Sequence, residues 1–215
     1  MADARSAIVE AMMKLAAERR FEDISIRDIA AEAGVSLADF RDAFPSKGAA
    51  LAGFSRQIDR AVLTVALGEL SSSSARDRLF DVLMRRFDAL APYREALHNI
   101  FAWLRRDPTA LIEINRLTVN SMRFMLEAAG IDSDGPTGAV KLQGLALAWG
   151  RVFQIWLDDA PPDFAKTMSA LDRELSRGER LVGGLDRLAS PARALARIGA
   201  RRRPRDEAPA ADGAP

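Results

Sequence analysis

The feature that most constrains this chain is the spacing of its apolar residues, which repeats with the period of an α-helix along most of its length. Between residues 75 and 90, for example, Leu79, Leu83, Phe87 and Leu90 fall on one helical face. No bounded run alternates apolar and polar residues as a half-buried strand does. We therefore expect an all-α fold of about nine helices, near residues 3–20, 26–33, 37–43, 47–70, 75–90, 92–106, 108–129, 139–158 and 163–188.

Composition narrows the class of protein. The 215 residues contain no cysteine and one histidine, so the sequence predicts neither a disulfide nor a transition-metal site. No stretch is long and apolar enough to span a membrane, and the beginning of the chain lacks the features of a secretory signal. We expect a cytoplasmic protein without a cofactor.

Residues 21–54 contain two short helices joined by a tight turn. Ser25 and Asp28 have the spacing of a capping box, and Ser36 and Asp39 repeat it at the start of the next helix. Gly34 lies between the two helices, where the chain needs a left-handed conformation. This pattern is the signature of a helix-turn-helix, whose second helix presents its first residues to the major groove of DNA.

The same segment resembles the DNA-binding domain of the TetR/AcrR family of bacterial transcriptional regulators. The resemblance lies in the apolar face that ends at Phe21, in SIRDIAAEAGVS, and in the Phe-Pro-Ser-Lys run at 44–47 that leads to Leu51. It implies a helix-turn-helix domain at 1–56, a helical ligand-binding and dimerisation domain at 57–189, and a homodimer on double-stranded operator DNA. The basic, Pro- and Ala-rich residues 190–215 predict a disordered tail.

Family positions transfer to this chain residue by residue. The resemblance implies that Arg27 contacts a backbone phosphate and that Ser36 caps the second helix beside the DNA. It also implies that Leu37, Ala38 and Arg41 face the major groove. Lys47 lies at the first turn of the next helix, where an anion can bind. The predicted DNA-binding residues are Arg27, Ser36, Leu37, Ala38, Arg41 and Lys47.

Some positions depart from the family pattern. Ala38 stands where glycine is usual, and Arg41 stands where tyrosine is usual. Asp39 and Asp42 place negative charge on the helix that would meet phosphates, although Asp39 can complete a capping box. The first 56 residues hold eight basic and nine acidic residues, a net charge of −1, so a DNA contact must depend on where the charges lie.

Large apolar side chains recur in the second domain, which includes all three tryptophans. They form either ordinary core or the wall of a cavity for a small hydrophobic effector between the helices. The predicted ligand-binding residues are His98, Trp103, Phe124, Met125, Trp149 and Phe153, and Gln154 is a polar group that can orient a ligand. The resemblance places the dimer interface on the last two helices, where Leu171 and Leu175 predict an apolar seam.

A second function is compatible with the sequence. Residues 156–175 (WLDDAPPDFAKTMSALDREL) resemble the end of a lipid-binding protein family of coenzyme Q biosynthesis, which has the TetR fold but does not bind DNA. The alternative to a ligand-responsive regulator is therefore a lipid-binding protein of the same fold. An enzyme is not expected, because the sequence contains no nucleophile elbow, phosphate-binding glycine loop or cluster of metal ligands.

Overall fold

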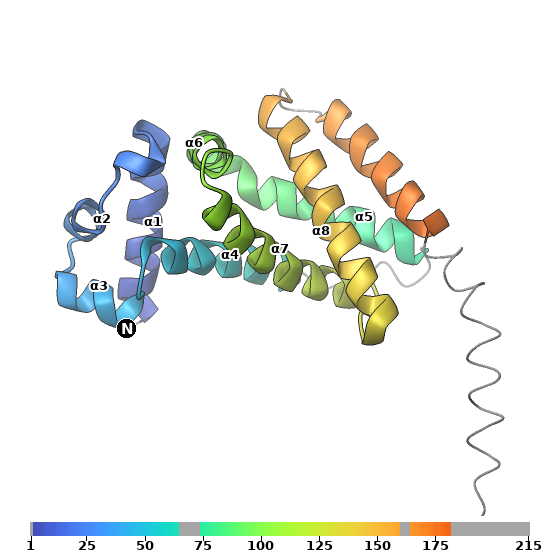
Figure 1. Ribbon diagram of the computed structural model, residues 1–215, viewed down its shortest axis with the longest axis horizontal. Helices are drawn as coiled ribbons and strands as arrows, with labels where there is room; N and C mark the ends of the chain where they lie inside the picture. Colours follow the sequence, from blue (N-terminus) through green and yellow to red (C-terminus); the bar gives the residue numbers. More distant parts are fainter. Residues whose placement is uncertain (1, 65–73, 160–163, 182–215) are drawn as a thin grey trace, which may run out of the picture. The chain divides into compact units, whose positions relative to one another are not determined.

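The computed structural model describes residues 2–64, 74–159 and 164–181 of the chain. Helices form throughout this part, as the helical spacing of the apolar residues predicts. Every regular element there is a helix, which confirms the all-α prediction (Figure 1). Residues 165–181 are helical as well. The elements are α1 (Ala2–Glu18), η1 (Phe21–Asp23), α2 (Ile26–Glu32), α3 (Leu37–Ala43), α4 (Lys47–Leu63), α5 (Ala75–Leu90), η3 (Ala91–Tyr93), α6 (Arg94–Leu104), α7 (Pro108–Ala128) and α8 (Gly135–Asp158).

Most helix ends lie within two residues of the predicted ones, except the end of α4, which is Leu63 rather than residue 70, and the start of α8. Helix α8 begins at Gly135 rather than at residue 139, so the predicted loop at 130–138 was too long. Proline at the start of α8 explains the error, because a first helical turn needs no backbone N–H from it and its fixed φ suits the helix. The last residues of the predicted helices at 47–70 and 163–188, the serines at 71–73 and the tail at 190–215 lie outside the described residues.

Both predicted capping boxes are present. The backbone N–H of Asp28 donates to Ser25 Oγ over 3.1 Å, and the Asp28 carboxylate accepts from the backbone N–H of Ser25. Ser36 and Asp39 form the same pair of bonds at the start of α3. Each box satisfies amide groups that a helix start leaves without partners, so both helices have fixed first residues.

The turn between α2 and α3 depends on Gly34. Its φ is +65°, a region that residues with a Cβ adopt at a cost, and no atom lies within 4 Å of the position that a Cβ would take. The backbone N–H of Val35 donates to Ala30 O over 3.0 Å and closes the turn. Backbone conformation alone therefore selects glycine here.

The core is continuous from the first helix to the last described one within the compact unit Met1–Gly178. Helix α1 packs against α2, α3, α4 and α6, and α4 leads from these helices to α5 and α7 (Figure 1). Helix α4 thus runs through residue 56, the predicted domain boundary. The two predicted domains share this helix, which gives any change in one a direct path to the other.

In the described part of the chain, the helices are too short or too polar to cross a membrane. The same residues contain no group of three acidic or histidine side chains arranged to hold a metal ion.

We predict that Gly34→Ala lowers the free energy of unfolding by about 1 kcal/mol, because the left-handed backbone conformation is unfavourable for alanine. Gly178 offers a matched control, since it also has open space at its Cβ position but lies in a helical segment. Gly178→Ala should raise the free energy of unfolding by about 0.5–1 kcal/mol. Urea unfolding measures both, and an equal effect of the two substitutions would contradict the assignment.

Candidate functional site

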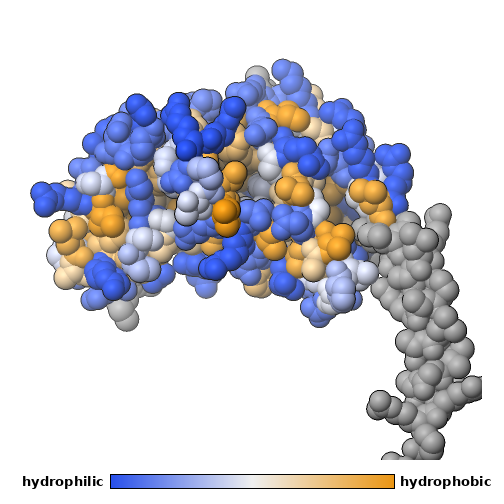
Figure 2. Space-filling model, viewed as in Figure 1, coloured by the Kyte–Doolittle hydropathy of each residue, from blue (hydrophilic) through white to orange (hydrophobic). Residues whose placement is uncertain are grey.

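One face of α3 is exposed to solvent. The side chain of Leu37 is 51% exposed, and Ala38, Arg41 and Asp42 are exposed beside it. Phe40, on the inner side of the same helix, is buried. At the end of the molecule that contains α2 and α3, exposed apolar side chains lie among hydrophilic ones (Figure 2). The buried inner side fixes the helix and leaves its outer face available to a partner.

Two further predicted DNA contacts flank this face. Arg27 is exposed in the first turn of α2. The Ser36 hydroxyl donates to Asp39 Oδ2 over 2.6 Å, and these bonds with the Ser36 side chain and backbone hold the pKa of Asp39 below its usual value. Asp39 therefore has a structural role as a cap. Asp42 is exposed and takes no part in either capping box.

Lys47 has a different environment from the one that its sequence position suggests. Its ammonium group donates to Phe21 O over 2.7 Å and to Ile24 O over 2.9 Å, and it lies 4.3 Å from the centre of the Phe21 ring. Burial lowers the pKa of Lys47. Two of its three N–H groups are thus used inside the protein, where they tie the start of α4 to the segment before α2.

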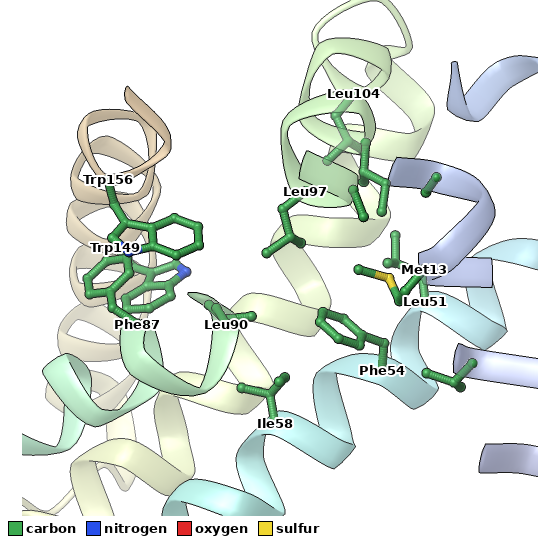
Figure 3. Close-up of a cluster of buried hydrophobic side chains, with 14 of the residues drawn as sticks. Met13, Leu51, Phe54, Ile58, Phe87, Leu90, Leu97, Leu104, Trp149 and Trp156 are labelled. Atoms are coloured by element: carbon green, nitrogen blue, oxygen red, sulfur yellow. The ribbon is translucent and has the colours of Figure 1, made fainter. Parts of the chain in front are cut away.

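A cavity of about 440 Å³ lies among α4, α5, α6, α7 and α8. Trp149 and Leu90 lie on one side of it, with Phe54 and Leu97 opposite (Figure 3). The volume falls within the range of about 300–1,000 Å³ that is usual for small-molecule sites. Its lining residues are Leu51, Phe54, Ser55, Arg86, Leu90, Leu97, Ile100, Phe101, Leu104, Arg105, Leu111, Ile114, Asn115, Leu117, Thr118, Ala146, Leu147, Trp149, Gly150, Arg151, Phe153 and Gln154.

The inner wall of the cavity contains a buried ion pair. Arg86 Nη1 donates to Asp59 Oδ1, which also accepts from Ser121 Oγ over 2.7 Å. The Arg86 guanidinium lies 5.3 Å from the centre of the Trp149 ring, and its Nη2 is 3.5 Å from Ser55 Oγ. Burial lowers the pKa of Arg86 to about 10, so the group stays cationic at neutral pH. The pair joins α4, α5 and α7 behind the cavity.

The structure brings two of the six predicted ligand residues, Trp149 and Phe153, together at the cavity, where Gln154 also lies. The other four lie elsewhere, because they project from other faces of their helices. His98 is exposed and Phe124 is 47% exposed, whereas Met125 is buried in the core and Trp103 packs against Phe21.

Sequence reasoning missed Arg86, although the sequence contains a signal for it. Arg86 stands between Leu83 and Leu90 at the spacing of the apolar face of α5, where a solvated arginine is out of place. A charged residue at such a position is buried with a partner or bound to something. Its partner Asp59 occupies a similar position between Ser55 and Val62 on α4.

Helix α6 joins the cavity to α1 and η1. Phe101 and Leu104 line the cavity, whereas Trp103 of the same helix lies 5.0 Å from the ring of Phe21. Asn99 Nδ2 donates to Ala16 O on α1 over 2.8 Å, and Arg106 pairs with Glu22 at 3.3 Å. A displacement of α6 at the cavity therefore acts directly on α1 and η1.

Helix α8 carries an exposed apolar stripe. Val140, Leu147 and Ile155 are 54%, 53% and 37% exposed and recur at helical spacing. The predicted seam at Leu171 and Leu175 was wrong, because both side chains are buried within the protomer core. Exposed apolar side chains also lie on the helix at 165–181, at Met168 and Leu181.

No protein-family model and no curated protein sequence matches the chain. Among solved structures, a TetR transcriptional regulator from Nitrosomonas europaea aligns with a TM-score of 0.64 and 24% sequence identity, over 81% of this chain and 97% of its own. A TetR transcriptional regulator from Rhodococcus sp. RHA1 aligns with a TM-score of 0.58 and 23% identity, over 81% of this chain and 95% of its own. The chain therefore has the fold of TetR regulators, as the sequence predicted.

The buried ion pair leads to a stability prediction. Arg86→Met removes the cation and leaves the Asp59 carboxylate buried with Ser121 alone, so the free energy of unfolding should fall by about 3–5 kcal/mol. The double variant Asp59→Leu/Arg86→Met removes both charges and should be more stable than Arg86→Met. Urea unfolding followed by tryptophan fluorescence measures these values.

Arg60→Met is the matched control, because Arg60 is exposed on the same helix as Asp59. It should change the free energy of unfolding by less than about 0.5 kcal/mol. A double variant as unstable as Arg86→Met would show that the pair contributes through packing rather than through charge.

Proposed function

We propose that this protein is a homodimeric transcriptional regulator, most simply a repressor, that binds operator DNA through α3 and releases it when a small hydrophobic molecule enters the cavity. The observation that carries the proposal is the exposed outer face of α3, whose start is fixed by the Ser36 capping box, in a chain that also encloses an apolar cavity. A fixed helix with an exposed outer face suits the major groove, which admits an α-helix.

The proposed DNA contacts divide into two kinds. Arg27 contacts a phosphate and positions the protein, and Ser36 fixes the start of α3 beside the backbone. Leu37, Ala38 and Arg41 face the base edges, where an arginine can pair with guanine O6 and N7. Lys47 has one N–H group left for a phosphate, so its main role is to hold the domain together.

The proposed dimer explains how the α3 helices of two copies contact one operator. Exposed apolar side chains on α8 and on the helix at 165–181, such as Val140 and Met168, would be covered by the same residues of a second copy, as a two-fold interface requires. Two α3 helices would then enter successive major grooves about 34–36 Å apart.

Release follows from the shared helices. Leu51 and Phe54 of α4 line the cavity, and Lys47 at the start of that helix holds the Phe21 segment. A ligand that prefers a different arrangement of α4 and α6 shifts the population of dimers away from the spacing that fits DNA. The size of the effect equals the difference in ligand affinity between the two arrangements.

The alternative is a lipid-binding protein of the same fold that does not bind DNA. Asp42 supports it, because this exposed carboxylate beside Arg41 leaves the outer face of α3 without net positive charge. The two functions differ in one measurable property, which is affinity for duplex DNA.

Selection of duplexes from a random pool, followed by anisotropy titrations at several salt concentrations, tests the proposal. Arg41→Ala should lower discrimination between selected and random duplexes by about 1–3 kcal/mol. Arg27→Ala should weaken both kinds of duplex alike and reduce the salt slope by about one, because it removes a phosphate contact.

Arg116→Ala is the control, since Arg116 is equally exposed but lies on α7. It should leave both quantities unchanged. A protein that enriches no duplex and binds none at low salt would rule out the regulator and favour the lipid-binding alternative.

A further inference from the structure

We infer that the ligand of the cavity is an amphipathic anion, an apolar chain with a carboxylate or similar oxyanion head group that lies between Arg105 and Arg151. This inference rests on the proposed effector role of the cavity and names the class of effector. It starts from the charges of the lining, which includes three arginines and no aspartate or glutamate. A wall of this kind favours an anion over a cation of the same size.

The depth of each arginine decides where the head group lies. Arg86 is buried and already pairs with Asp59, so a second anion beside it would be buried next to a carboxylate. Arg105 and Arg151 are exposed and lie beside Leu111 and Leu147 in the lining, both of which are about half exposed. The exposed arginines therefore mark the open end of the cavity, and the apolar interior takes the chain.

The open end keeps positive charge after its internal pairs are counted. Arg151 pairs with Glu174, but the same carboxylate also accepts from Arg177 Nη1 over 2.9 Å, so two arginines share one acid. Among the described residues, no acid forms an ion pair with Arg105. Asp107 is the acidic residue nearest to Arg105 in the sequence. Its carboxylate caps α7 by accepting from the backbone N–H groups of Thr109 and Ala110.

The interior favours a flexible apolar chain. Phe54, Leu97 and Ile100 are buried and face the cavity from two helices. Gln154 and Asn115 lie among the lining residues and can bond the head group or its first polar atoms. Guanidinium groups bind carboxylates with paired hydrogen bonds between two opposite charges, and a neutral hydroxyl head group lacks both the charge and the second acceptor oxygen.

Equilibrium dialysis of the full-length protein tests the inference with three probes of equal chain length: dodecanoate and dodecylammonium below their micelle concentrations, and dodecanol below its solubility limit. We expect dodecanoate to bind about tenfold more tightly than dodecanol, as one charge-assisted hydrogen bond allows, and dodecylammonium to bind most weakly. Arg105→Gln/Arg151→Gln should remove the preference for dodecanoate and leave the affinity for dodecanol unchanged.

Arg116→Gln is the matched control, because it removes an exposed positive charge from the outer face of α7 and should keep the full preference. Equal affinity for the three probes, binding of none of them, or a preference that survives the double substitution would each overturn the inference. The selection of DNA duplexes is independent of these probes, so a regulator with a different effector class would still bind its operator.

Discussion

The arrangement of this protein depends on the Phe21 side chain, which is fully buried where three elements meet. Trp103 of α6 packs against one side of the ring, and the ammonium group of Lys47 lies over it while bonding the carbonyls of Phe21 and Ile24. These contacts fix α6 and α4 to the short segment that precedes α2. Since the same two helices form much of the cavity wall, the cluster at Phe21 connects the apolar interior with the segment that leads into α2, and α2 packs against α3.

This connection has a physical consequence for the proposed regulation. Interdigitated side chains in a close-packed core do not slide continuously, so a ligand that spreads α4 from α6 must move the Phe21 segment as a body or leave a void. Asn99 and Arg106 add polar contacts from α6 to Ala16 and Glu22, which favour movement as a body. In the proposed regulation, the coupling passes through α1, which packs against both α6 and α3.

Local signals predicted the first half of the fold closely. The capping boxes at Ser25 and Ser36 and the glycine between them act over a few residues, so the helices they bound are visible in the sequence. The cavity was predicted less well, because its wall takes residues from five helices and their rotation depends on packing that no single segment encodes. Trp149 and Phe153 were found by their size and spacing, whereas Trp103 has the same character and packs on Phe21.

Arg86 illustrates the limit of sequence reasoning in a different way. Its position on an apolar face signals that it is buried, but its partner Asp59 is on another helix and its neighbour Ser121 on a third. A buried pair of this kind costs desolvation energy that a leucine or methionine would avoid, so stability alone does not explain it. The pair does place a cation behind Trp149 while it cancels that charge for the interior. Because Asp59 neutralises Arg86, the proposed selection of an anion depends on Arg105 and Arg151 at the open end. The interior of the cavity then suits the uncharged apolar chain of the ligand.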